Sequence, residues 1–191
     1  MEKQLETDLL HVAHESIAEE LGGGLSETYA VLREKYKEIY IEPVGLFVTL
    51  KKKDTNNTSS TLRGCIGTIE GVYPLIEGVY RLAKESAFED PRFLPVSIDE
   101  CSLLTIHISI LSTLQEITQP SAIILGIHGV VYQYRHHRAL FLPEVALEQH
   151  WSLHKLLTQL CIKASLPPNH YHTKEGKLYT FTVESFEDND E

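Results

Sequence analysis

The chain has 191 residues, of which 42% are hydrophobic and 23% are charged, and its formal net charge is −10. This length and composition are typical of a globular domain with a sizeable core. The acidic charge argues against nucleic-acid binding, because an acidic surface repels phosphate, and no apolar run approaches the roughly 20 residues of a membrane helix.

The cellular compartment is predicted from the N-terminus and the cysteines. The first residues lack the basic and then apolar order of a signal peptide. The three cysteines are odd in number and widely spaced, so they do not suggest a disulfide framework. Both observations predict a cytoplasmic protein with reduced thiols.

The N-terminal part of the chain is predicted to be helical. Apolar residues recur at helical spacing between Lys3 and Leu21, and the run Gly22–Gly24 ends this helix. A second, short helix is expected from Ser26 to about Tyr36, because charged residues follow the serine.

A β-hairpin and a third helix are predicted next. The segments Val44–Lys53 and Thr61–Ile69 have the composition of strands, and the polar segment Asp54–Ser60 between them is expected to be a loop. A helix is expected over Pro74–Asp90, because proline favours a helix start and the residue before the next proline resists the helical conformation. Phe93 is expected to be buried where the chain turns back onto the sheet.

The clearest strand is predicted from Leu104 to Ile110, where isoleucine alternates with polar residues. Further elements are expected in this order: short strands at residues 123–125, 130–134 and 139–142, a turn or short helix at 143–151, a helix at 153–164 and a last strand at 178–186. Helices and strands do not alternate in a regular βαβ order, so the pattern favours an α+β fold with an antiparallel sheet.

The segment Leu62–Thr68, with the sequence LRGCIGT, carries the most information. Glycine inside a strand costs about 0.5–1 kcal/mol relative to alanine, and often marks a bulge or the close approach of another backbone or a ligand. Alternation places Arg63, Cys65 and Gly67 on one face of the strand, and a nearby guanidinium favours the nucleophilic thiolate. The alternative is a small, packed cysteine beside glycines that permit tight packing.

Other candidate residues lie further along the chain. His128, in a glycine turn, would be either a base at the rim of a site or a turn histidine bonded to nearby backbone. Glu144 would be either a carboxylate favoured by a helix N-terminus or an acid of the site. The paired histidines at positions 136–137 and 170–172 lack metal-ligand spacing, so neither a metal nor another cofactor is predicted.

The segment LRGCIGT resembles the signature of the AMMECR family, whose bacterial and archaeal members are called AmmeMemoRadiSam system protein A. Further segments resemble family motifs and follow in the family's order between residues 44 and 186: Gly45–Leu50, Ser86–Phe93, Ile108–Ser112, Gly126–Gly129 and Leu142–Gln149. The chain departs from the family pattern at His150, where glycine is expected, and over Asn169–Gly176.

The resemblance implies that residues 1–191 form one α+β domain with an antiparallel sheet flanked by helices, a smaller second α+β lobe and a cleft between the lobes. The larger lobe would contain both chain ends. The signature strand would face the cleft, to which Gly64, Gly67, Thr68 and Arg92 would contribute as ligand-binding residues. The family's association with Memo-type and radical-SAM proteins implies such proteins as partners.

Two functional hypotheses remain open. In the first, the protein is an enzyme or an enzyme component that uses Cys65 as a nucleophile on a large, protein-like substrate, with Arg63 polarising the thiol and His128 as a base. In the second, the protein is a binding module for a protein or peptide, and Cys65 only packs.

Overall fold

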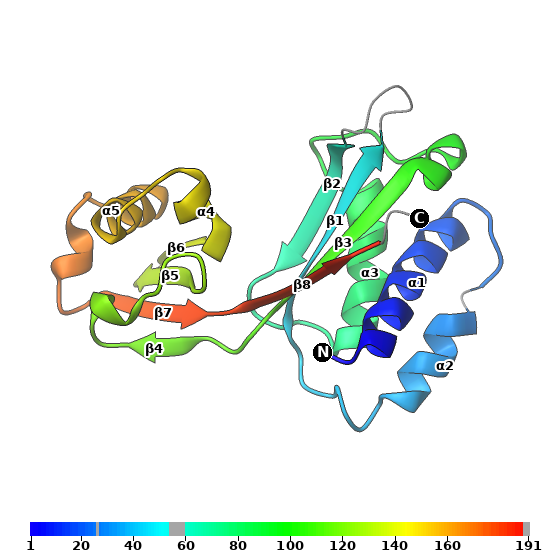
Figure 1. Cartoon of the computed structure of the whole chain (residues 1–191), viewed down its shortest axis with the longest axis horizontal. Helices are drawn as coiled ribbons and strands as arrows, with labels where there is room; N and C mark the ends of the chain where they lie inside the picture. The colour runs from blue at the N-terminus through cyan, green and yellow to red at the C-terminus, as the bar shows by residue number, and fades with distance from the viewer. Residues whose placement is uncertain (26, 54–59, 189–191) are drawn as a thin grey trace. The chain divides into compact units, whose positions relative to one another are not determined.

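The computed structural model describes residues 1–25, 27–53 and 60–188, and the chain divides into two compact units (Figure 1). The first unit comprises Met1–Leu111 together with Glu184–Glu191, and the second comprises Ser112–Val183. Antiparallel sheets flanked by helices confirm the predicted α+β class. Among the helices that the structure describes, none has the length and apolar character to cross a membrane.

The first unit contains a four-stranded sheet with the order β2-β1-β3-β8. Its strands are β1 (Gly45–Lys53), β2 (Ser60–Thr68), β3 (Leu104–Leu111) and β8 (Val183–Glu187). The central strand β1 pairs antiparallel with both β2 and β3, so the strand with the LRGCIGT segment lies at an edge of the sheet. Leu46, Val48 and Leu50 alternate along β1 and are buried, because one face of the sheet carries the core.

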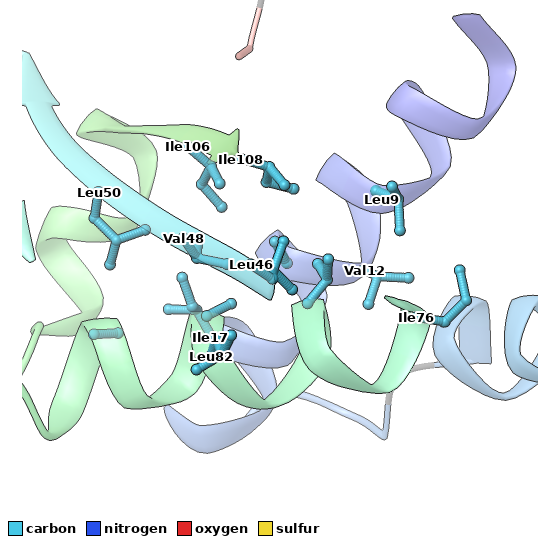
Figure 2. Packing of buried hydrophobic residues seen from close by; sticks show 14 of the residues in the cluster. Leu9, Val12, Ile17, Leu46, Val48, Leu50, Ile76, Leu82, Ile106 and Ile108 are labelled. Carbon is cyan, nitrogen blue, oxygen red and sulfur yellow. The ribbon is translucent and has the colours of Figure 1, made fainter. Parts of the chain in front are cut away.

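Helices α1 (Lys3–Glu20) and α3 (Leu75–Phe88) pack against the core face of this sheet, as Figure 2 shows. Both helices and both central strands contribute side chains to the core, among them Leu9, Val12, Ile17, Val48, Ile76, Leu82, Ile106 and Ile108. A short 3-10 helix (Ile98–Leu103) leads into β3. Helix α2 (Glu27–Lys35) is attached through buried Leu32 and through Tyr29, which stacks on Tyr80.

The second unit contains a smaller four-stranded sheet with the order β4-β7-β5-β6. Its strands are β4 (Gln115–Ile117), β5 (Gly129–Tyr134), β6 (His137–Phe141) and β7 (Lys177–Phe181). Its helices are α4 (Pro143–Glu148), α5 (Leu153–Lys163) and two 3-10 turns (Pro120–Ala122 and His170–His172). Its separate core is formed mainly by Val130, Tyr132, Leu156, Leu157, Leu160, Cys161 and Leu178.

Three predictions about single elements are wrong. Residues 123–125 form no strand, because the main-chain N–H of His128 bonds to the carbonyl of Ile124 and closes a turn through Gly126, which has a φ of 82°. The predicted last strand is divided at Thr182 into β7 and β8, which belong to different sheets. Phe93 is half-buried instead of buried.

Some predictions fall on residues outside the described ranges. Ser26, the predicted start of the second helix, is one of them, and the described part of that helix begins at Glu27. Of the predicted loop Asp54–Ser60, only Ser60 is described, and it is the first residue of β2.

Candidate functional site around Cys65

The strand β2 contains a β-bulge in the middle of the LRGCIGT segment. Leu50 of β1 pairs with Gly64, and the next residue, Lys51, pairs with Leu62, so Arg63 is an extra residue on β2. The bulge interrupts the alternation on which the shared face of Arg63 and Cys65 was predicted. The position of each of these side chains is therefore set by its own contacts.

Arg63 is bound to the segment that leads into β3. Its Nε and Nη2 donate to the carboxylate of Glu100 at 3.1 and 3.0 Å, and its Nη1 donates to the carbonyl of Leu94 at 2.8 Å. The side chain is only 13% exposed. Hydrogen bonds from Arg63 and Lys52 hold the pKa of Glu100 well below its usual range. Arg63 thus neutralises an internal carboxylate and fixes a loop.

The main chain of Cys65 is held by two side chains from the turn that follows α3. Its N–H donates to Oδ2 of Asp90 at 2.9 Å, and its carbonyl accepts from Nη2 of Arg92 at 3.2 Å. Arg92 also binds Asp90 through Nε at 2.9 Å and Nη2 at 2.6 Å. These two side chains therefore satisfy Cys65 backbone groups at the edge of the sheet, in place of a further strand.

Asp90 is buried and Arg92 is exposed to solvent. The Asp90 side chain is 1% exposed, and the hydrogen bonds from Arg92 and the Cys65 N–H hold its pKa far below its usual range. The Arg92 side chain is 54% exposed. Its pKa is raised chiefly by Asp90, and a negative charge on Cys65 adds to this rise. Arg92 is therefore an exposed cation that is hydrogen-bonded to the main chain of Cys65.

The thiol of Cys65 accepts a hydrogen bond from the hydroxyl of Thr49 at 3.2 Å and is half-buried. Thr49 pairs with Cys65 on one side and with His107 on the other, so the three residues form one row across β2, β1 and β3. Two strand spacings, about 10 Å, separate Cys65 from His107, which is too far for a direct hydrogen bond between their side chains. Thr49 is thus the polar neighbour that contacts the sulfur.

Thr49 was not identified from the sequence as a site residue. A signal was available, because Thr49 lies between the buried residues Val48 and Leu50, and alternation places it on the opposite face of the sheet. What alternation alone does not give is the register that sets Thr49 opposite Cys65.

The two glycines of the segment are in close contact with the chain's own atoms. A Cβ at Gly64 would lie closer than 3.0 Å to the carbonyl oxygen of Ser86 on α3. A Cβ at Gly67 would come equally close to the carbonyl of Leu46 and to the ring of Phe47. Glycine in a strand predicts that another group comes close to its backbone. Here those groups belong to the first unit itself.

Buried Ser86 links α3 to the hairpin a second time. Its hydroxyl donates to the carbonyl of Val48 at 2.8 Å and accepts from the N–H of Ile66 at 2.9 Å. Together with the close packing on Gly64, these bonds fix the end of α3 against β2. The residues that surround Cys65 are consequently held in place from the helix as well as from the sheet.

The remaining candidates have different surroundings. Thr68 is the last residue of β2 and pairs with Leu46. His128 and Glu144 belong to the second unit. The Nδ1 of His128 accepts the N–H of Ile124 at 3.2 Å, and Glu144 is exposed in the first turn of α4. Within the described ranges, no group of three or more histidine, cysteine or acidic side chains is arranged to hold a metal ion.

Comparisons with known proteins agree along most of the chain. A family model described as AMMECR1 matches residues 10–186. A protein of Methanocaldococcus jannaschii is 34% identical over 83% of this chain and 80% of its own length. One from Methanothermobacter thermautotrophicus is 32% identical over 93% of this chain and 91% of its own length. The crystal structure of an uncharacterized Pyrococcus horikoshii protein superposes with a TM-score of 0.74 at 32% identity, covering 95% of this chain and 90% of the other.

Proposed function

Because this chain belongs to the AMMECR1 family, we propose a function for the cysteine of its LRGCIGT segment. Cys65 acts as a nucleophilic thiol on a large, protein-like substrate, and the protein is an enzyme or a component of one. The single observation that carries this proposal is the pair of groups that contact Cys65, namely the Thr49 hydroxyl, which donates to the sulfur, and the Arg92 guanidinium, which donates to the carbonyl.

Both groups can interact with the negative charge of a reacting sulfur. A hydroxyl that donates to sulfur stabilises the negative form, and an adjacent cation does the same through space. Both arginines are paired with a carboxylate, Arg63 with Glu100 and Arg92 with Asp90. Arg92 suits this role better than Arg63, because it also donates to the Cys65 carbonyl, whereas the bonds of Arg63 go to Glu100 and to the main chain of residues 94 and 95. Arg92 is also more than half exposed, so it remains accessible to an anionic or carbonyl group of a substrate. No step in this chemistry needs His128 or Glu144.

The proposal is tested by the rate of thiol alkylation. In a Cys101→Ser/Cys161→Ser background, Cys65 is the only thiol of the chain, and its reaction with iodoacetamide is followed by mass spectrometry under native conditions. Cys65 is expected to react faster near neutral pH than the thiol of glutathione. Arg92→Met and Thr49→Val should each slow the reaction, whereas Arg63→Met, which removes a cation with no hydrogen bond to Cys65 among those described, should leave the rate nearly unchanged.

Melting temperatures of all variants are measured in parallel, so that unfolding is not mistaken for a change in reactivity. A Cys65 that reacts no faster than glutathione in the folded protein would remove the basis of the nucleophile hypothesis. The same conclusion would follow if Arg92→Met and Arg63→Met changed the rate equally.

A binding module is the second candidate, and one observation favours it. Gly64, Gly67, Arg63 and Asp90 all have internal contacts that explain their presence without any reaction. In this case the Cys65→Ser variant, which nearly preserves the volume of the side chain, would retain partner binding and full activity in cells. Loss of cellular function in a folded Cys65→Ser protein would decide for the nucleophile.

Partners are proposed from the family resemblance. Memo-type and radical-SAM proteins are the candidates, and co-purification of tagged protein from cells is the first measurement. Their consistent absence from the purified material, together with no effect of either on any activity of the protein, would count against such an association.

A further inference from the structure

A pocket distant in sequence from Cys65 lies between α2 and the start of α3. Its volume is about 130 Å³, comparable with an apolar cavity of roughly 150 Å³ that holds benzene. It is lined by Arg33, Tyr36, Lys37, Tyr40, Ile41, Pro74, Ile76 and Glu77. The pocket is therefore large enough for one aromatic or branched aliphatic side chain.

The walls of the pocket are tied to the rest of the first unit. The turn after α2 is closed by a hydrogen bond from the N–H of Tyr40 to the carbonyl of Tyr36 at 3.1 Å. The segment that follows is joined to the start of α3 by a β-bridge between Pro43 and Pro74. Ile76, on one wall, belongs to the buried core. The pocket is thus lined by residues of α2, of the segment that follows it and of the start of α3; Figure 1 shows the ribbon of these elements.

The open side of the pocket is apolar. Ile41 lines the pocket and is 60% exposed, and neighbouring Ile39 is 67% exposed. Single exposed aliphatic side chains are ordinary, but Ile41 at the pocket and Ile39, two residues earlier in the same segment, together expose apolar surface that water solvates poorly. This surface extends beyond the pocket, so an occupant that covers it is larger than a small molecule.

The charged residues that line the pocket are Arg33, Lys37 and Glu77. Lys37 forms an ion pair with Glu34, and Glu77 forms one with Arg81. Arg33 forms no ion pair with any residue in the described part of the chain. In a chain with a net charge of −10, this leaves one uncompensated guanidinium beside an apolar pocket. A carboxylate is the group that complements it.

We propose that this pocket is a docking site for a segment of a partner protein that combines an apolar side chain with adjacent acidic residues. The aromatic or branched aliphatic side chain enters between Tyr36, Tyr40 and Ile76, the segment covers the exposed isoleucines, and a carboxylate binds Arg33. Nucleic acid does not suit the site, because the acidic surface of the chain repels phosphate backbones. The site is independent of the proposed chemistry at Cys65.

The test is a fluorescence-polarisation titration of the full chain with labelled hexapeptides. The first peptide has a Leu-Phe centre flanked on each side by two acidic residues. Two controls replace either the centre by Ser-Ser or the flanks by lysine. The acidic apolar peptide is expected to bind at least about tenfold more tightly than either control, because each control lacks one of the two complementary groups.

Substitutions at the pocket and away from it test where the peptide binds. Arg33→Glu and Ile41→Asp should each weaken binding of the acidic apolar peptide at least about tenfold, and Arg33→Gln should weaken it less. Arg135→Glu changes an arginine in the second unit whose side chain is 70% exposed, and should have no effect. Cys65→Ser should also leave binding unchanged, whatever the outcome of the thiol experiments.

The proposal is overturned by any of three results. One is the absence of saturable binding of the acidic apolar peptide up to about 1 mM, the weak end of specific recognition. Another is binding of the lysine-flanked peptide with the same affinity as the acidic apolar peptide. The third is unchanged binding in both Arg33→Glu and Ile41→Asp proteins that retain the melting temperature of the parent.

Discussion

The carboxylate of Asp90, two residues after α3, accepts the main-chain N–H of Cys65 at 2.9 Å, although the two residues are 25 positions apart. Arg92 completes the arrangement by binding both the carboxylate and the Cys65 carbonyl. The helix end and the edge strand are therefore joined through one buried charge. This connection fixes the main chain of Cys65 from residues that are distant in sequence.

The Asp90→Asn substitution should lower the free energy of unfolding by about 1.5–3 kcal/mol, because it weakens hydrogen bonds made by a charged and buried group. Chemical denaturation at pH 7 measures the change. Asp99→Asn is the matched control, since Asp99 is exposed and a surface change of this kind stays within about 0.5 kcal/mol. Equal effects of the two substitutions would show that the bond to Cys65 contributes little.

The stability of the protein should fall on acidification, in part through Glu100. Its pKa in the folded state lies below the value in the unfolded chain, so ionised Glu100 stabilises the fold at pH values above the unfolded pKa of about 4.3. This stability is lost as the pH falls below that value towards the folded pKa. Denaturation curves between pH 7 and pH 2.5 should therefore show a shallower decline for Glu100→Gln than for the unchanged protein.

Glu85 is a control, because its pKa is shifted in the direction opposite to that of Glu100. Desolvation raises its pKa in the folded protein, so its ionised form opposes folding and acidification relieves this cost. Glu85→Gln should then make the decline towards low pH steeper. If both substitutions altered the pH dependence of stability in the same direction, the opposite pKa shifts described for Glu100 and Glu85 would be wrong.

Gly64→Ala should destabilise the protein by at least about 1–3 kcal/mol, the usual cost of overpacking. The added methyl group would overlap the carbonyl of Ser86, which is fixed in the last turns of α3. Thermal unfolding measures the loss. Gly24→Ala is the control, because a Cβ at Gly24 meets no atom within 4 Å. A Gly64→Ala protein with an unchanged melting temperature would contradict the close packing of α3 on β2.

Phe93→Ala should cost about 1–2 kcal/mol, less than the roughly 3–5 kcal/mol of a fully buried phenylalanine. The ring is half-buried and lies beneath the guanidinium of Arg92 at 5.4 Å. Val96→Ala, which removes fewer atoms from a buried side chain, should cost at least as much. The two variants are compared by their denaturant midpoints. A markedly larger loss of stability for Phe93→Ala would indicate that Phe93 is buried, as predicted from the sequence.

The helices and strands that bury one continuous face were predictable from the sequence. Spacing alone located α1, β1 and β3, because each places its apolar residues at the period of a helix or a strand. The same reasoning failed at residues 178–186, where the strand pattern is continuous but the strand changes sheets at Thr182. The choice of a neighbouring strand depends on distant pairing, which local alternation does not encode.

The candidate site was predictable in its position and less so in its contacts. The glycines and Cys65 of the LRGCIGT segment marked the strand correctly as unusual. The bulge at Arg63 displaced that residue towards Glu100, and this depends on a register that no local pattern reveals. Thr49 and Asp90 reach Cys65 from 16 and 25 residues away, so their roles became visible only in the folded chain.

The second unit begins and ends at neighbouring positions. The N–H of Ser112 donates to the carbonyl of Thr182 at 2.9 Å, and the N–H of Thr182 donates to the hydroxyl of Ser112 at 2.9 Å. The second unit is therefore an insertion between two strands of the larger sheet, and its two ends are hydrogen-bonded to each other. We expect that changes of length within this segment leave the strand order of the larger sheet unchanged, because the segment leaves and rejoins that sheet at one place.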